Sequence, residues 1–465
     1  MADVPADTPD FIYFESVEQL ASWHPSSASP IHISNTPLFP RAHISNPIPQ
    51  PSTQQDVTPC PAARRDHTPS KTQSATPQLT PLLVCHDFKG GYLAHEAAQG
   101  IASSETVYTC EYLQYIDIFV YFSHKRVAVP PASWINLMHK NGVKILGTFL
   151  VEHDTGAVEL RKIFGEGTDG PDASFYANQL VSLAKTYGFD GWLLNFESSF
   201  PSGTFDLPIF QSWLEYLKDE MHRAVTGGQV IWYDALTIDN RVFYQNGITD
   251  ANKPFFDVSD GIFTNYWWRE HNIRSTADIA STLGRPRDVL CGVDVWGRGS
   301  LGDGGFNVGE ALASIQRHGL AAAIFAPGWT FEHLGPEKFR ENEQKFWVGD
   351  SYRRPAGAGF GPIAQYSKLL ACGTSNFFYT NFSRGFGNVW RVGGEVCMIP
   401  LRHVESWVPV VGIKCTDHRC RYSSNLPCHG STLEYNRFCQ ISQRKMANSS
   451  IGIWTQNTRT RAVGA

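Results

Sequence analysis

An amide and a carboxyl group stand two residues apart near the middle of the chain, at Asn195 and Glu197. They close the segment DGWLLNFE (190–197), whose nearly continuous apolar residues are typical of a buried β-strand. Side chains alternate between the two faces of a strand. Asn195 and Glu197 are therefore expected to share one face with Leu193, side by side near the end of the strand.

This pairing suits hydrolysis of a glycosidic bond beside a 2-acetamido sugar. Most glycosidases use two carboxyl groups, but the acetamide oxygen can replace one of them by attacking the anomeric carbon and forming an oxazoline. Glu197 would donate a proton to the leaving oxygen and later activate water, and Asn195 would hold the acetamide N–H. Glu197 would then need a pKa raised by apolar neighbours. The alternative is a polar hydrogen-bond network in the core, without a catalytic role.

Eight short apolar runs recur between residues 81 and 335 and predict the elements that position this pair. Each reads as a parallel strand buried on both faces, and several linking segments have apolar residues at helical spacing. Eight strands over roughly 250 residues is the size of a (β/α)8 TIM barrel. The alternative is a doubly wound open sheet, but no Gly-rich phosphate loop follows the first run. The runs are 82–88, 117–123, 143–152, 191–198, 230–236, 261–268, 289–297 and 321–329.

Polar and aromatic residues gather where these runs end. In a TIM barrel the active site lies at the carboxyl ends of the strands, so such residues are expected to meet around one pocket. His124 and His153 also follow runs, but they are equally compatible with surface loops. The candidates for substrate contact are His86, Asp87, Glu152, Asn265 and Trp296.

The segments outside the runs differ in composition. Residues 1–23 hold a short apolar stretch that predicts a small element docked on the barrel. Residues 24–80 are rich in Pro, Ser and Thr, which predicts a largely disordered N-terminal insertion. Residues 395–465 contain Cys but no periodicity and no paired C-x2-C spacing of a zinc site, so an irregular tail is expected there.

Composition excludes several classes of protein. The formal net charge of -5 gives no basic footprint for nucleic acid. No apolar run reaches the roughly 18 residues that a membrane helix needs. The N-terminus lacks the basic and apolar regions of a secretory signal, so we expect a cytosolic protein. No motif requires a metal or an organic cofactor.

Several motifs in the same order resemble glycoside hydrolase family 85, the cytosolic endo-β-N-acetylglucosaminidases. The strongest are DGWLLNFES (190–198) and VIWYDALT (230–237). The resemblance covers roughly residues 81–335, and weakly 11–41. The supporting motifs are HDFKGGYL (86–93), DIFVYFSH (117–124), VPPASW (129–134) and NGVKILGTFLVE (141–152).

The resemblance implies hydrolysis of the β-1,4 bond between the two core N-acetylglucosamines of N-glycans, glycopeptides or free oligosaccharides. It also implies retention of configuration through an oxazoline, with possible transfer to another acceptor. Members of the family generally continue into β-sandwich domains. Residues 336–394 then read as a remnant leading toward such a domain, which leaves an incomplete or irregular C-terminal region.

The resemblance also assigns roles to individual residues. Asn195 and Glu197 match the catalytic pair, and Tyr233 matches the tyrosine that hydrogen-bonds the acetamide oxygen. Trp267 and Trp268 fall in the aromatic stretch that lines the sugar subsites, although both also fit ordinary barrel packing. Tyr244 lies in the loop near the acceptor side, where a tryptophan is expected.

Two other functions are compatible with parts of the sequence. A chitinase-like glycosidase would carry a DGxDxDxE run, but Leu193 and Asn195 replace its last two aspartates. A catalytically silent, glycan-binding barrel is the second alternative. The joint presence of Glu197, Asn195 and Tyr233 argues against it.

Overall fold

The computed structural model describes residues 11–43, 79–96, 107–165, 172–349 and 359–372, together with four short strands beyond them. The chain divides into two compact units. The larger holds all the elements described below up to β12. Of the smaller unit, the described residues form two antiparallel pairs, β13 (Trp390–Val392) with β14 (Glu395–Met398) and β15 (Lys414–Thr416) with β16 (Arg419–Arg421). The remainder of the predicted tail lies outside the described residues.

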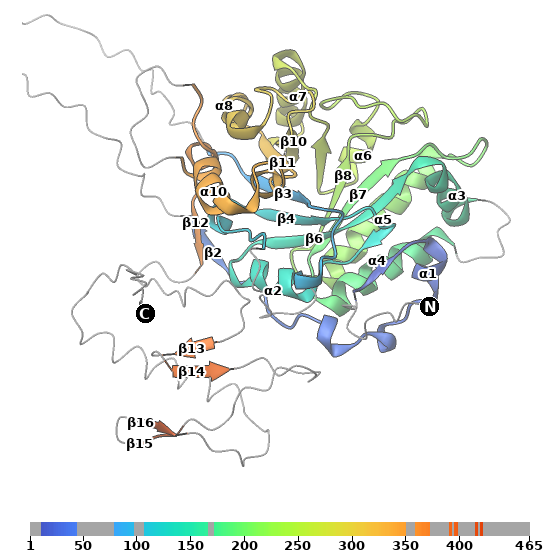
Figure 1. Cartoon of the computed structure of the whole chain (residues 1–465). Coiled ribbons are helices and arrows are strands. Elements are labelled where there is room, and N and C mark those ends of the chain that lie inside the picture. The colour runs from blue at the N-terminus through green and yellow to red at the C-terminus, as the bar shows by residue number, and fades with distance from the viewer. Residues whose placement is uncertain are drawn as a thin grey trace, which may run out of the picture. The chain divides into compact units, whose positions relative to one another are not determined.

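The larger unit is built on a closed parallel barrel (Figure 1). Each strand pairs in parallel with the next in the ring, and the pairings of β11 with β3 and of β6 with β7 close it. The predicted (β/α)8 barrel is thereby confirmed. Its strands are β3 (Leu82–Asp87), β4 (Ile118–Phe122), β6 (Lys144–Glu152), β7 (Gly191–Glu197), β8 (Gln229–Tyr233), β9 (Gly261–Thr264), β10 (Val289–Asp294) and β11 (Ala321–Phe325).

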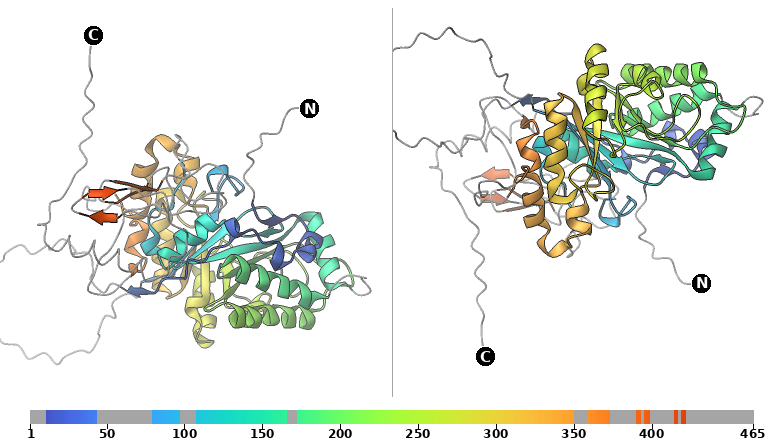
Figure 2. Two further views of the ribbon diagram at one scale, coloured as in Figure 1. Left: turned by 90° about the horizontal axis from the view of Figure 1, so that it is seen from below. Right: turned by 90° about the horizontal axis from the view of Figure 1, so that it is seen from above.

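Helices lie outside the strands, as two further views show (Figure 2). Their ends follow local sequence signals. The Asp172 side chain accepts a hydrogen bond from the Phe175 N–H at the start of α4, and Gly188 ends that helix with φ 82°. In the described ranges, no helix combines the length and the apolarity required to cross a membrane. The helices of this unit are α1 (Val17–Ser22), α2 (Ala132–Lys140), α3 (His153–Phe164), α4 (Ala173–Tyr187), α5 (Leu207–Ala224), α6 (Lys253–Asp257), α7 (Glu270–Thr282), α8 (Val308–Arg317), α9 (Trp329–Glu332) and α10 (Phe339–Trp347).

Two apolar cores follow from the alternation of side chains along the strands. Leu193 belongs to the core inside the barrel, together with Leu83, Leu146 and Ile231. The residues on either side of Leu193 face outward and pack beneath the helices. The orientation predicted for 190–197 is therefore confirmed, and Asn195 and Glu197 point into the barrel.

The N-terminal residues pack on the barrel. The second half of β6 leaves β4 and pairs with β5 (Val127–Ala128), to which β1 (Tyr13–Phe14) adds a further strand. Residues 24–43, which composition assigns to the disordered insertion, also contact the barrel. The Ser34 N–H donates to the Tyr187 carbonyl at 3.0 Å, and β2 (Arg41–His43) pairs with β12 (Leu370–Cys372). Residues 44–78 of that predicted linker lie outside the described residues.

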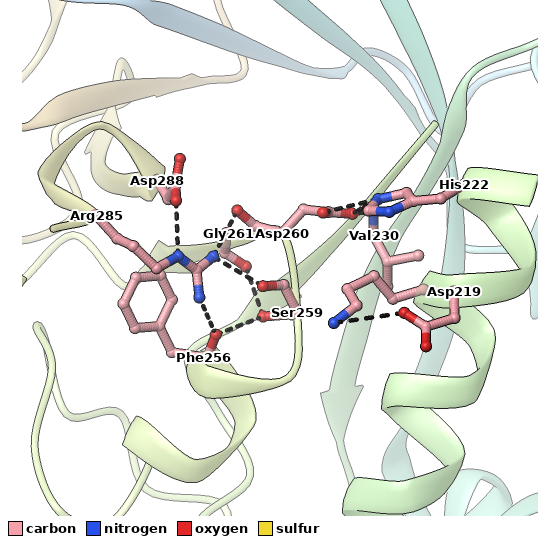
Figure 3. Close-up of polar contacts among 10 residues, drawn as sticks. Asp219, His222, Val230, Phe256, Ser259, Asp260, Gly261, Arg285 and Asp288 are labelled. Atoms are coloured by element: carbon pink, nitrogen blue, oxygen red, sulfur yellow. Dashed lines mark hydrogen bonds and ion pairs between the residues drawn. The ribbon is translucent and has the colours of Figure 1, made fainter. Parts of the chain in front are cut away.

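The Arg285 side chain joins several backbone carbonyls at the amino-terminal end of the barrel (Figure 3). The Arg285 guanidinium donates to the carbonyls of Phe256 at 2.8 Å, Ser259 at 2.8 Å and Asp260 at 2.9 Å, and pairs with Asp288 at 2.8 Å. Its carbon Cζ lies 4.2 Å from the centroid of the Phe256 ring. The planar guanidinium group thus donates hydrogen bonds to three carbonyls that precede β9.

We expect Arg285→Met to lower the free energy of unfolding by about 2–4 kcal/mol, because three carbonyls lose their donor. Activity of the folded variant should be unchanged, since the barrel strands separate Arg285 from the pocket. Urea denaturation measures the first effect and steady-state kinetics the second. Arg274→Met, at an exposed position on α7, is the matched control. Equal stability of the two variants would contradict the stabilising role of the Arg285 hydrogen bonds.

Glu343 is a buried acid on α10 that faces α9. Glu343 accepts hydrogen bonds from the Thr330 hydroxyl at 2.6 Å and from the Trp347 indole at 2.9 Å. Burial raises the pKa of Glu343 to about 8. The folded protein therefore retains a proton that the unfolded chain releases near the ordinary glutamate value.

This linkage makes stability fall as pH rises. The stability that the protonated Glu343 contributes is fully present below the pKa that this residue has in the unfolded chain. It is lost as pH increases toward 8, at up to about 1.4 kcal/mol per pH unit. Between pH 5.5 and 7.5 the wild type should lose up to about 2.7 kcal/mol more stability than Glu343→Gln, which cannot ionise. Urea denaturation at the two pH values tests this, and parallel losses in both proteins would refute it.

Candidate active site

A cavity of about 370 Å³ opens at the carboxyl ends of the barrel strands. It gathers most of the side chains that the sequence selected from different strand ends. Arg298, Tyr266, His124 and Phe325 also line it. The sequence-predicted residues in its wall are Asp87, Glu152, Asn195, Glu197, Tyr233, Tyr244, Asn265 and Trp267.

Glu197 is the central carboxyl group of this cavity. Asn195 Nδ2 donates to its Oε1 at 3.3 Å, and the Tyr244 hydroxyl donates to its Oε2 at 3.1 Å. Burial raises the pKa of Glu197, and the two hydrogen bonds oppose that shift without cancelling it. Glu197 consequently retains its proton to higher pH than an exposed glutamate does, as a general acid requires.

A second carboxyl group lies beside it. Glu152 is the register partner of Glu197 on the neighbouring parallel strand β6. Its Oε1 accepts from His124 Nδ1 at 3.4 Å and lies 3.6 Å from His153 Nε2. Because His124 lines the cavity, it belongs to the site, although the sequence left it equally compatible with a surface loop.

Tyr233, at the end of β8, faces the same cavity. Its hydroxyl donates to Asn265 Oδ1 at 3.3 Å. Burial holds the pKa of Tyr233 well above its ordinary value, so the hydroxyl keeps its proton. Asn265 in turn donates from Nδ2 to Asn246 Oδ1 at 2.8 Å. The side chains of Tyr233, Asn265 and Asn246 therefore form one chain of hydrogen bonds.

Asp234, the next residue after Tyr233, anchors the loop that carries Tyr244. Its buried carboxylate accepts from the backbone N–H groups of Gln245 at 3.1 Å and Asn246 at 2.8 Å, and from Asn252 Nδ2 at 2.9 Å. Burial raises the pKa of Asp234 to about 6, against these hydrogen bonds. Asn246 is held at φ 58°, a left-handed conformation that Asn tolerates. One acid thus fixes the loop facing Glu197.

Aromatic side chains form the rim. Trp267 is 54% exposed, and its indole N–H donates to the Arg298 carbonyl at 2.8 Å. Its ring lies edge-on to Tyr244, with centroids 5.9 Å apart. An exposed ring with a fixed edge offers its faces to the apolar faces of sugars.

Three residues selected from the sequence do not line the cavity. His86 faces outward on β3 and packs against Phe88 and Trp134, and burial lowers its pKa to about 3. Trp268 is buried beneath the helices, and its indole N–H donates to the Gly292 carbonyl at 2.7 Å. Trp296 is exposed on the loop after β10, outside the cavity wall.

Arg298 is the main residue that sequence reasoning missed. It pairs with Asp294 at 2.7 Å, four residues earlier at the end of β10. The sequence did contain a signal for it, because Asp294 lies near the end of an apolar run and Arg298 follows four residues later. Within the described ranges, no three His, Cys, Asp or Glu side chains come together as metal ligands would.

A carboxyl group whose pKa is raised by burial, in an aromatic-rimmed cavity at the carboxyl ends of a (β/α)8 barrel, is an arrangement that glycoside hydrolases use. Comparison with known sequences specifies the class further. Glycosyl hydrolase family 85 matches residues 92–390. The chain belongs to this family.

Similar proteins come from animals and plants. A cytosolic endo-β-N-acetylglucosaminidase of Gallus gallus is 38% identical over 345 residues, which cover 74% of this chain and 42% of that protein. Cytosolic endo-β-N-acetylglucosaminidase 2 of Arabidopsis thaliana is 37% identical, covering 68% of this chain and 42% of that protein. The Homo sapiens protein is 35% identical, covering 74% and 42%. The chain thus spans about two fifths of the length of the curated relatives it matches.

A solved structure shares the fold. The glycoside hydrolase domain of Endo-D from Streptococcus pneumoniae R6 superposes with a TM-score of 0.64 at 22% identity. The match covers 84% of this chain and 59% of that one.

Proposed function

We propose that this chain is an endo-β-N-acetylglucosaminidase that hydrolyses the β-1,4 bond between the two core N-acetylglucosamines of N-glycans. The observation that carries the proposal is the hydrogen-bonded pair of Asn195 and Glu197 at the floor of the cavity. The three animal and plant relatives described above bear the name of this activity.

The first step forms an oxazoline that keeps the N–H proton and is therefore a cation (an oxazolinium ion). Asn195 Oδ1 accepts from the acetamide N–H of the sugar whose bond breaks, which turns the acetamide oxygen toward C1 of that sugar. As this oxygen bonds to C1, the bond from C1 to the bridging oxygen breaks and Glu197 gives its proton to the leaving oxygen. The raised pKa of Glu197 favours this, because the acid form must be populated before the bond breaks.

The second step reverses the role of Glu197. Its carboxylate takes a proton from water as the water oxygen attacks C1 and opens the oxazoline. Two successive displacements at C1 leave the product in the β configuration. A sugar hydroxyl in place of water would give transfer of the glycan.

The remaining wall residues position the substrate. The Tyr233 hydroxyl donates to Asn265 in the free site and would donate to the acetamide oxygen when substrate is bound. Trp267 and Tyr244 stack on sugar rings at the acceptor side, and Asp87, Glu152 and Asn265 accept from or donate to sugar hydroxyls. Tyr244 has a second role, because its hydroxyl orients the Glu197 carboxyl group.

The same comparison supports a proposal for the location of the substrates. The relatives are named as cytosolic proteins, and we propose the cytosol for this chain as well. Its substrates there would be glycopeptides or free oligosaccharides released from glycoproteins.

Mass spectrometry of a high-mannose glycopeptide after incubation with the protein tests the proposal. The expected product is the peptide carrying a single N-acetylglucosamine. Hybrid and complex glycopeptides and polymeric chitin are assayed in parallel. Cleavage of chitin alone would identify a chitinase-like enzyme, and no cleavage of any substrate by folded protein would identify a silent glycan-binding barrel.

A further inference from the structure

Beyond the cavity, three rings form a shelf on the loops that follow β10 and β11. Trp296, 40% exposed, lies edge-on to His333 with centroids 5.8 Å apart. His333 is exposed and stacks on Trp329 at 5.3 Å and 20°. Phe306 supports the far edge of Trp329 at 5.3 Å. Exposed apolar and aromatic groups that gather in one patch often mark a binding site.

The loop that carries Trp296 is rigidly anchored. The buried Asp294 carboxylate accepts from the Trp296 N–H at 3.2 Å and the Arg298 N–H at 3.1 Å. Gly297 has φ 77°, and a Cβ there would meet the Asp303 carbonyl oxygen at 2.3 Å. The turn thus sets the position of the Trp296 backbone before any ligand arrives, which lowers the entropic cost of binding.

Sequence neighbours link the shelf to the cavity at two points. Arg298 lines the cavity and follows Trp296 by two residues, and its carbonyl holds the Trp267 indole. Glu332 precedes His333 in sequence. The pKa of Glu332 is raised by burial and by the nearby Asp87 carboxylate, which itself lines the cavity. A ligand leaving the cavity past Asp87 or Arg298 would therefore meet the shelf.

The size of the cavity leaves the outer sugars of an N-glycan outside it. At about 370 Å³ it is near the lower end of the range of roughly 300–1,000 Å³ found for small-ligand sites. A branched N-glycan is larger than such a ligand, so its outer sugars must lie outside the cavity. Pyranoses present apolar C–H faces, and indole and imidazole rings are suitable platforms for them.

We propose that Trp296, His333 and Trp329 form an outer carbohydrate subsite that binds a pyranose on an arm of the glycan, beyond its core. This proposal rests on the proposed function and extends it to the recognition of the glycan arms. The catalytic pair is not involved. The shelf contributes binding energy only for glycans long enough to reach it.

Two substrates and two variants test the proposal. The kcat/KM values are measured for a full high-mannose glycopeptide and for the same glycopeptide trimmed to its core pentasaccharide. In Trp296→Ala the ratio of the two values, full over trimmed, should fall about tenfold relative to wild type. His333→Ala should lower the same ratio in the same direction. Phe39→Ala, which removes an exposed ring from the segment packed on α2, is the control and should leave the ratio unchanged.

An unchanged ratio in Trp296→Ala and His333→Ala would overturn the subsite. So would an equal fall for both substrates, which would indicate a structural role of the loop. If the wild type cleaves neither substrate, the proposed function fails on its own. The shelf is then tested by calorimetry with the free high-mannose oligosaccharide, where equal affinity of wild type and Trp296→Ala would overturn it.

Discussion

Glu197→Gln is expected to lower kcat/KM for a glycopeptide by about 10³-fold or more, because general acid catalysis contributes roughly 10²–10⁴-fold and the same group serves both steps. Gln keeps the size of the side chain and can still bond to Asn195 and Tyr244, but it has no proton to give to the leaving oxygen. Steady-state kinetics with a single glycopeptide, on protein shown to be folded, measures the loss.

Glu152→Gln is the matched control. It replaces the register partner of Glu197, and it removes the carboxylate that a two-carboxylate mechanism would use as nucleophile. We expect this variant to lose less than about tenfold, the size of a lost substrate contact. A loss equal to that of Glu197→Gln would assign the nucleophile to Glu152 and exclude the acetamide mechanism.

Asp234→Asn is expected to lower kcat/KM by about 10²-fold although Asp234 does not line the cavity. The carboxylate accepts hydrogen bonds from three backbone N–H groups, those of Gln245, Asn246 and Asn265, and from the Asn252 amide. An asparagine of the same shape would face some of these donors with its own NH2 group, so the loop carrying Tyr244 would be released. Displacement of a group that positions the reacting atoms commonly costs about this much.

The pH profile distinguishes this positioning role from a general loss of stability. Tyr244 donates to Glu197 and thereby lowers its pKa against the effect of burial. When Tyr244 is displaced, the pKa of Glu197 rises, and the alkaline limb of kcat/KM against pH should move to higher pH. Asp260→Asn is the control, because Asp260 accepts the Val230 N–H at 2.7 Å at the opposite end of the barrel (Figure 3). An alkaline limb that stays in place in Asp234→Asn would contradict the role proposed for Asp234.

Alternation along strands explains which site residues the sequence could predict. Asn195 and Glu197 lie within β7, where a period of two fixes the face. The same rule applied to β3 separates Asp87, which faces inward, from His86, which faces outward. His86 was selected because it is a polar residue where a run ends, but the face of the strand on which it lies decides its placement.

Beyond the strand ends this rule no longer applies. β9 ends at Thr264, so nothing in the spacing of Trp267 and Trp268 indicates that one ring is exposed and the other buried. Contacts between residues distant in sequence could not be predicted from the sequence either. Residues 24–43 are ordered because carbonyls of α4 and α2 accept hydrogen bonds from the N–H groups of Ser34 and Phe39 and because β2 pairs with β12, whereas their composition alone favours disorder.

Inhibition by a thiazoline analogue tests the central claim most directly. The analogue is the thiazoline of the core N-acetylglucosamine on the donor side of the cleaved bond, with its mannose attached; sulfur replaces the oxygen of the oxazoline ring and the bicycle resists hydrolysis. If the acetamide is the nucleophile, the analogue resembles the intermediate, and its inhibition constant should lie at least about 10²-fold below KM for the glycopeptide. Inhibition no stronger than that by the hydrolysis product would contradict the account, because Asn195, Glu197 and Tyr233 would then not be arranged around an oxazoline.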